Sequence, residues 1–129
     1  MRRRMARLGG RAVFLPFQPM SDYLRILQLA DASLDSPSWS GGVTTIDAIA
    51  MGTPTITLPG EFMRGRMSRA FLLEAGAPGL VAQDEGHYIR MAIDAEGSRA
   101  AMAGVNVESL YEDARSAHAI EQHLLAQMS

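Results

Sequence analysis

Short apolar segments alternate along the chain with stretches in which apolar residues recur every three or four positions. The short segments are rich in β-branched residues and predict buried strands at residues 11–17, 32–36, 53–59 and 78–82. The helical spacing predicts helices at residues 22–31, 44–52, 66–75, 84–95 and 110–128. Strands that alternate with helices form parallel βα units with right-handed crossovers. We therefore expect an α/β fold, a Rossmann-like parallel sheet with flanking helices.

Capping residues mark the expected ends of several helices. Ser21 and Asp22 stand at the start of the first helical stretch and Asp84 at the start of the fourth, where side-chain oxygens accept backbone N–H bonds. Gly52 and Gly76 follow the second and third stretches, and glycine readily takes the left-handed conformation that ends a helix. These residues predict where the helices of the sheet's two faces begin and end.

The composition is that of one ordinary globular domain, with 129 residues, 47% of them hydrophobic and 20% charged. We expect a βα core over about residues 11–95 and carboxyl-terminal helices over about 98–129. A net charge of −2 favours no nucleic-acid partner, and the lack of cysteine excludes disulfides and thiolate metal sites. No apolar run suits a signal peptide or a membrane span, so we expect a cytoplasmic protein without a membrane partner.

Two adjacent glycines, Gly41 and Gly42, follow the expected strand at residues 32–36. Ligands of parallel sheets bind beyond the carboxyl ends of the strands, where loops lead into helix N-termini. The N–H groups of Val43, Thr44 and Thr45 would be unpaired in the first helical turn, and glycine lets the backbone approach a ligand and adopt positive φ. All twelve basic residues are arginine, so N–H groups, the helix dipole and a threonine hydroxyl would bind a phosphate here without lysine.

The same residues also suit a loop that only turns the chain. Thr44 can cap the helix, and Asp47, three residues later, can complete a variant of the capping box. In the binding interpretation Asp47 faces the same side of the first turn and accepts hydrogen bonds from both hydroxyls of a ribose. The local pattern leaves the two interpretations open.

The remaining residues predict neither a catalytic site nor a metal site. His118 and His123 are five positions apart on a helix, so they do not share a face and do not suit a common metal ion. No Ser-His-Asp set and no pair of carboxylates emerges, so we expect no catalytic base in this chain. Trp39 lies beside the glycines, where stacking on a base or sugar and packing within the loop are both open.

Three ordered motifs carry a resemblance to a known family: LAD-x-x-LD-x-P, GG-x-TT-x-D and GTP-x-x-TLPGE. Over about residues 11–95 the sequence resembles the carboxyl-terminal half of the O-linked N-acetylglucosamine transferase family. The resemblance is strongest to its bacterial, SPINDLY-like members, which follow tetratricopeptide repeats. These are inverting, metal-independent glycosyltransferases of the GT-B fold, in which two Rossmann-like domains face each other across a cleft.

The resemblance implies roles for the residues that match the family's motifs. Asp47 would take the ribose hydroxyls of a UDP-sugar, and Gln18 and Tyr23 would lie on the uracil side. UDP-N-acetylglucosamine is the expected donor substrate, and neither a cofactor nor a metal ion is implied. The residues that would hold its diphosphate are Gly41, Gly42, Val43, Thr44 and Thr45.

The family's amino-terminal GT-B half, with its catalytic base and acceptor surface, has no counterpart in this sequence. We therefore expect residues 1–129 to form a partial domain that binds a UDP-sugar but is inactive alone. Its partners in a longer chain would be the upstream GT-B half, tetratricopeptide repeats and a protein acceptor. The strand at 11–17 would lack its usual neighbours and would pair with 32–36, dock on another chain or stay an exposed edge. A second hypothesis is a non-catalytic nucleotide-binding or protein-interaction module left from a truncated glycosyltransferase.

Overall fold

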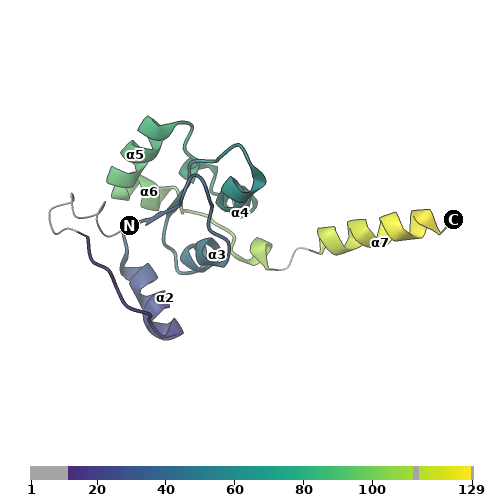
Figure 1. Cartoon of the computed structure of the whole chain (residues 1–129), viewed down its shortest axis with the longest axis horizontal. Helices are drawn as coiled ribbons and strands as arrows, with labels where there is room; N and C mark the ends of the chain where they lie inside the picture. Colours follow the sequence, from purple (N-terminus) through teal and green to yellow (C-terminus); the bar gives the residue numbers. More distant parts are fainter. Residues whose placement is uncertain (1–11, 112–113, 129) are drawn as a thin grey trace.

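The structure, a computed structural model, describes residues 12–111 and 114–128 (Figure 1). Helices and short strands alternate along it, which confirms the α/β class that the sequence predicts. The elements are α2 (Met20–Leu29), β1 (Ser33–Leu34), α3 (Val43–Ala50), β2 (Thr55–Ile56), η2 (Met63–Gly65), α4 (Met67–Glu74), η3 (Pro78–Leu80), α5 (Glu85–Ile93), α6 (Ala95–Ala100), η4 (Glu108–Leu110) and α7 (Arg115–Gln127).

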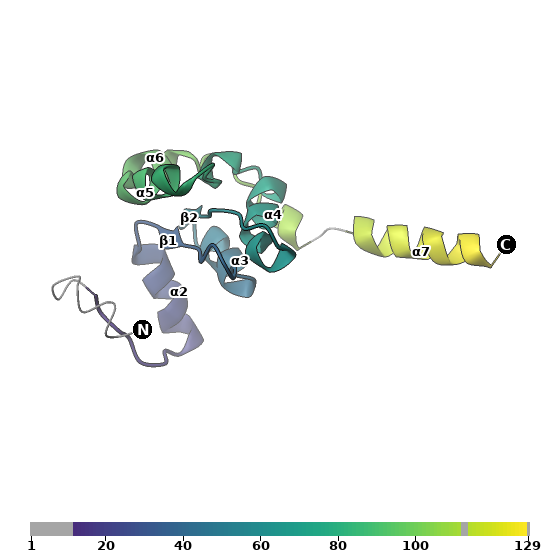
Figure 2. The same ribbon diagram turned by 45° about the horizontal axis from the view of Figure 1, so that its top comes forward.

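A small parallel sheet lies between two layers of helices. β1 pairs in parallel with β2, with Ser33 opposite Thr55. A third strand position is reduced to one parallel bridge between Thr57 and Val81. α3 and α5 both contact β2, and Figure 2 shows them on opposite sides of it. This arrangement of a parallel sheet with helices on both faces is the Rossmann-like architecture in reduced form.

The expected strand at residues 11–17 is wrong for the part that the structure describes. Residues 12–17 form no strand, and residue 11 lies outside the described ranges. A strand exists only where a partner completes its hydrogen bonds, and none of the described strands pairs with this segment. Pro16 also lacks the N–H that a ladder needs. The apolar side chains that predicted a buried strand are exposed instead, 79% for Val13 and 97% for Phe17.

The expected strand at residues 78–82 is only partly present. Pro78–Leu80 form a 3-10 turn, and strand pairing is left to Val81 and its neighbours. The Thr57 N–H donates to the Leu80 carbonyl at 3.1 Å, and the Ala82 N–H donates to the Thr57 carbonyl at 2.8 Å. The ring of Pro78 fixes φ near −65° and so favours a turn at the start of the segment.

Three of the predicted helix ends are confirmed. Gly52 (φ 73°) and Gly76 (φ 83°) take the left-handed conformation directly after α3 and α4. The Asp84 carboxylate caps α5 by accepting a hydrogen bond from the His87 N–H at 2.7 Å. Each of these signals depends on the residue itself and its immediate neighbours.

Two predicted helix starts are wrong. α2 begins at Met20 after Pro19, without a side-chain cap, so Ser21 and Asp22 lie inside its first turn. The carboxyl-terminal helix begins at Arg115 rather than at residue 110, and residues 112–113 lie outside the described ranges. Before it, the chain makes a separate 3-10 turn, η4, which the sequence does not predict as an element of its own.

The hydrophobic core lies between the sheet and its helices. Ile49 of α3 and Ile56 of β2 are fully buried in it, and Tyr88 and Met91 of α5 pack against it. Burying one such aliphatic side chain contributes about 1.5–3 kcal/mol. This cluster therefore fixes α3 and the sheet relative to each other. Its buried members are Ile49, Ile56, Leu72, Ala75, Ala77 and Leu80.

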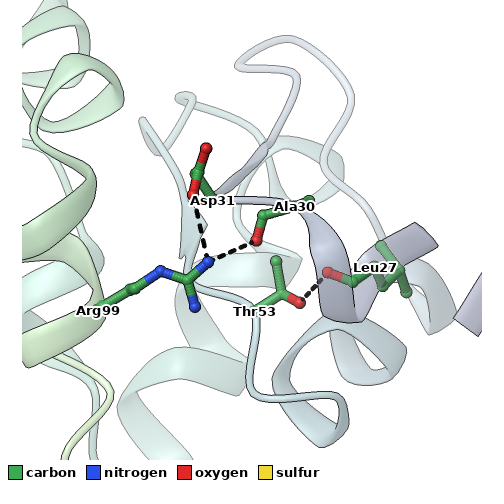
Figure 3. Close-up of polar contacts among 5 residues, drawn as sticks. All are labelled: Leu27, Ala30, Asp31, Thr53 and Arg99. Carbon is green, nitrogen blue, oxygen red and sulfur yellow. Dashed lines mark hydrogen bonds and ion pairs between the residues drawn. The ribbon is translucent and has the colours of Figure 1, made fainter. Parts of the chain in front are cut away.

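The carboxyl end of α2 and the residues after it are held by polar contacts from two side chains (Figure 3). The Thr53 hydroxyl donates to the Leu27 carbonyl at 2.6 Å. The Arg99 guanidinium of α6 donates to the Ala30 carbonyl at 3.1 Å and pairs with the Asp31 carboxylate at 3.3 Å. The last carbonyls of a helix lack intrahelical donors and carry the negative end of its dipole, so these groups complement them. α2 has no fully buried residue, and besides its contact with α3 these polar groups hold its carboxyl end.

The Thr55 hydroxyl is buried and has no hydrogen-bond partner among the described residues. A buried hydroxyl without a partner destabilises the fold, because it gives up its bonds to water. We predict that Thr55→Val raises the free energy of unfolding by about 1 kcal/mol. Urea unfolding measures this, and Thr57→Val is the matched control on the same strand. The Thr57 hydroxyl donates a bond of 2.6 Å, so its loss should lower stability, and equal effects of the two variants would contradict the assignment.

α7 projects away from the rest of the chain in both views (Figures 1 and 2). It has 13 residues, none of them buried, and Ile120 and Leu124 of its apolar stripe are 62% and 57% exposed. A helix of this length without tertiary packing is marginal in water. We predict that its amides exchange with deuterium much faster than those of α3, measured by mass spectrometry. Protection of α7 equal to that of α3 would show that its stripe is covered in solution.

Candidate functional site

The glycine loop connects β1 to α3 at the carboxyl end of the sheet. Gly42 is the residue before the helix, which begins at Val43, and no side chain caps this end. The interpretation of Thr44 as the cap is therefore wrong, because Thr44 already lies within the first turn. The loop leaves its helix N-terminus open, as an anion-binding turn requires.

Gly41 is a glycine because neighbouring atoms leave no space for a side chain. A Cβ atom at this position would lie 2.6 Å from Thr45 Oγ1 and 3.0 Å from Thr44 Oγ1. A Cβ atom at Gly42 would meet nothing closer than 3.7 Å. Neither glycine has a positive φ, contrary to one reason that the sequence offered for them. Glycine at position 41 therefore lets the backbone pack closely against the side chains of Thr44 and Thr45, and it is not needed for a left-handed conformation.

Three consecutive N–H groups at the start of α3 have no acceptor in the part of the chain that the structure describes. They belong to Gly42, Val43 and Thr44. The Thr45 N–H, expected to be unpaired, donates to the Gly42 carbonyl at 3.0 Å. Val43 is 72% exposed, and Thr44 is exposed as well. The free donors therefore begin one residue earlier than the sequence predicts, and they face solvent at the positive end of the helix dipole.

Asp35, which sequence reasoning did not assign to the site, lies directly beneath this loop. Its carboxylate is buried and accepts hydrogen bonds from the Gly41 N–H at 2.7 Å, the Ser40 hydroxyl at 2.8 Å and the Thr57 hydroxyl at 2.6 Å. Its carbonyl accepts a bond of 2.8 Å from the Tyr88 hydroxyl of α5. An acidic residue directly after a short apolar strand was the signal that could have identified it.

A chain of buried hydroxyl groups continues from Asp35 to α3 and α4. The hydroxyls of Ser40 and Ser68 lie 2.8 Å apart, and those of Ser68 and Thr45 lie 2.7 Å apart. The Ser68 N–H also donates to the Ser40 hydroxyl oxygen at 2.8 Å. Thr45 is only 3% exposed, so its side chain belongs to this internal network. Of the two threonines in the loop, Thr44 is the one whose hydroxyl faces outward.

A cavity of about 180 Å³ opens beside the loop. Asp35, Gly41, Thr44 and Thr45 contribute to its polar lining, and Trp39 forms part of its apolar side. Trp39 is 72% exposed, so its ring is available to a ligand bound at the loop.

No group of three or more histidine or acidic side chains gathers into a potential metal site within the described ranges.

The two residues predicted for the uracil side lie together on another surface. Gln18 and Tyr23 line an apolar groove of about 430 Å³, with Phe17 and Met20 among its other walls. The Gln18 side-chain amide donates to the Pro16 carbonyl at 3.0 Å, which leaves its own oxygen available. The groove lies along the amino-terminal half of α2.

None of the helices in the described ranges is long and apolar enough to cross a membrane.

Tyr23 of α2, which lines this groove, lies close to Asp47 of α3. Burial raises the pKa of Tyr23, and the charge of the nearby Asp47 carboxylate raises it further. The structure thus brings together two residues that are far apart in sequence and were predicted to bind neighbouring parts of one nucleotide. Asp47 is partly buried and remains accessible beside the first turn of α3.

We predict that Asp47→Asn lowers the pKa of Tyr23 toward its ordinary value of 10.0, because the neighbouring charge is removed. The pKa of Tyr88 is raised by burial and by Asp35, so it should stay unchanged and serves as an internal control. An NMR titration of the tyrosine ring carbons measures both. In the wild-type chain the unfolded state releases the Tyr23 proton first, so stability falls as pH rises above about 10. Equal Tyr23 pKa values in the two proteins would contradict the contact.

Comparison with known proteins places this geometry in a wider context. The model of a protein family described as glycosyl transferase family 41 matches residues 2–119. A UDP-N-acetylglucosamine–peptide N-acetylglucosaminyltransferase of Caenorhabditis elegans is 35% identical over 84 residues, which are 65% of this chain and 7% of that protein. A probable enzyme of the same name, SPINDLY, from Arabidopsis thaliana is 30% identical over 57% of this chain and 8% of its own length.

A solved structure shares the fold. A mutant of the O-GlcNAc transferase of Thermobaculum terrenum superposes with a TM-score of 0.67 at 32% identity, over 89% of this chain and 23% of that one. The chain thus spans less than a tenth of the length of the curated relatives it matches, 7% and 8% in the two named above.

Proposed function

The chain belongs to glycosyl transferase family 41, and from that premise we propose that it is the donor-binding part of a protein O-glycosyltransferase. The proposed donor is a UDP-sugar, UDP-N-acetylglucosamine, after which the relatives are named. The observation that carries the proposal is the row of three N–H groups without acceptors at the start of α3. They stand at the carboxyl end of a parallel sheet, where such folds bind nucleotides.

In this proposal the diphosphate binds at the first turn of α3. The N–H groups of Gly42, Val43 and Thr44 donate to its oxygens, the Thr44 hydroxyl adds a further donor, and the helix dipole favours the negative charge. Gly41 contributes shape rather than a donor, since its own N–H is bonded to Asp35. Thr45 supports the turn from inside through Ser68. No metal ion is needed to hold the diphosphate in this arrangement.

The nucleoside extends from the loop toward α2 in the same proposal. The ribose hydroxyls donate to the Asp47 carboxylate, which they share with the Tyr23 phenol. The uracil enters the apolar groove that Gln18 and Tyr23 line, where the free Gln18 oxygen can accept a base N–H. The packing of α2 on α3 brings the groove and the first turn of α3 to neighbouring parts of the chain.

The chemistry that this site supplies is stabilisation of the leaving group. When the sugar is transferred, negative charge develops on the departing UDP, and N–H groups fixed in advance stabilise it in the transition state. One contact of this kind is typically worth about 3 kcal/mol. The acceptor protein and the catalytic base would come from the remainder of a longer enzyme, so we expect no transfer by this chain alone. The non-catalytic alternative predicts the same binding of UDP. It differs only in that the chain would not be part of a larger, active enzyme.

A backbone substitution tests the row of N–H groups directly. We predict that Val43→Pro weakens UDP binding at least about tenfold, because it removes one N–H that would bond a charged phosphate. Proline is well tolerated at the first position of a helix, so the fold should persist. Val43→Ala keeps the N–H and is the matched control. Calorimetric titration with UDP measures all three proteins, and equal affinities for the two variants would exclude the backbone from the diphosphate site.

Asp47→Ala tests the ribose contact in the same titration. It should weaken UDP binding about tenfold as well, while leaving the response to inorganic diphosphate unchanged. If neither the wild-type chain nor the variants release or take up heat with UDP, and NMR shows no shifts on addition of UDP, the proposed function is wrong.

A further inference from the structure

Asp35 is a buried carboxylate without a positively charged partner. It is 7% exposed, and among the ion pairs of the described residues none involves it. Burying a charge is strongly unfavourable unless hydrogen bonds compensate it. Donors from Ser40, Gly41 and Thr57 provide that compensation, at 2.6–2.8 Å. Such short bonds to an ionised acceptor are among the strongest and most directional in proteins.

These bonds determine which way the loop presents its N–H groups. One oxygen of Asp35 holds the Gly41 N–H inward at 2.7 Å. The other accepts from Ser40, whose oxygen in turn accepts from the Ser68 N–H of α4 at 2.8 Å. With the residue before Gly42 fixed in this way, the next N–H groups along the chain turn outward. The absence of a side chain on Gly41 lets the loop lie this close.

The charge of Asp35 cannot itself attract a diphosphate. A carboxylate a few ångströms below a phosphate site repels it, and less water between the two strengthens that repulsion. Any benefit of Asp35 to diphosphate binding must therefore come through the geometry of the loop. Electrostatics and positioning predict effects of opposite sign when the charge is removed, so the two can be separated by experiment.

We infer that Asp35 is a positioning residue for the donor diphosphate, which acts through Gly41 and Ser40 and does not touch the ligand. The inference rests on the proposed function, since it assigns a task to a residue beneath the proposed diphosphate site. The buried carboxylate binds the Gly41 N–H, which is then not available to the ligand. This bond fixes the direction of the next three N–H groups, those of Gly42, Val43 and Thr44.

The test is Asp35→Asn, with UDP and uridine as ligands of the same folded chain. Asparagine has the same size, but only its oxygen accepts, so the Gly41 N–H, the Ser40 hydroxyl and the Thr57 hydroxyl cannot all keep the bonds that they donate to Asp35. We expect the dissociation constant for UDP to rise at least about tenfold and that for uridine to stay within about twofold. Calorimetry measures UDP, and an NMR titration measures uridine. Ser98→Ala is the matched control, because it removes a buried hydroxyl of α6 that donates to the Met91 carbonyl at 3.0 Å and takes no part in the loop.

Each other result decides against the inference or against its premise. Equal weakening of UDP and uridine would mean that Asp35 supports only the fold, and tighter UDP binding would mean that its charge dominates. Either result overturns the inference and leaves the proposed function in place. If the wild-type chain binds no UDP, the proposed function fails and the inference fails with it.

A second variant covers the case in which Asp35→Asn does not fold. Ser68→Ala removes the hydroxyl that joins Ser40 and Thr45 but keeps the Asp35 charge and the Ser68 N–H. The inference expects a smaller loss, of the order of threefold, again for UDP and not for uridine. Unchanged UDP binding in a folded Ser68→Ala variant that has lost these bonds would contradict positioning through the network.

Discussion

The buried Asp35 carboxylate is the interaction on which the arrangement of this protein most depends. It follows β1 directly, and its backbone N–H continues the ladder by donating to the Ile56 carbonyl at 3.0 Å. Its side chain joins the loop before α3 to β2 through Thr57, and its carbonyl receives the Tyr88 hydroxyl of α5. A charge buried without a cation requires all of its donors, because each one lost exposes a large desolvation cost. The geometry of the loop is therefore coupled to the sheet and to the helices on both of its faces.

Features of the fold that depend on neighbouring residues could be predicted from the sequence. Features that depend on partners far away in the sequence could not. The ends of α3 and α4 at Gly52 and Gly76, and the cap of α5 at Asp84, follow from short-range chemistry and are confirmed. The strand expected at residues 11–17 fails over residues 12–17, since an apolar pattern cannot show whether a partner strand exists.

The candidate site divides in the same way. Its place, after β1 and before α3, could be predicted because parallel sheets bind ligands at that edge. The hydrogen bonds that Gly41 and Thr45 make inside the protein could not be predicted. Their partners, Asp35 and Ser68, come close only in the folded chain, and Thr45 and Ser68 are 23 positions apart. Tyr23 and Asp47 are likewise brought together by the packing of α2 on α3, which no local pattern predicts.

Because the core is modest in size, any ligand that binds the folded chain would contribute a large share of its stability. The fully buried aliphatic cluster has few large members, while Phe17, Leu29 and Val43 leave much of their apolar surface in water. A ligand present at a hundred times its dissociation constant adds about 2.7 kcal/mol to the stability of the folded state. That is comparable to burying one leucine in the core. A ligand that spans the loop of α3 and the groove of α2 would therefore contribute to holding the two helices together, and not merely occupy the space between them.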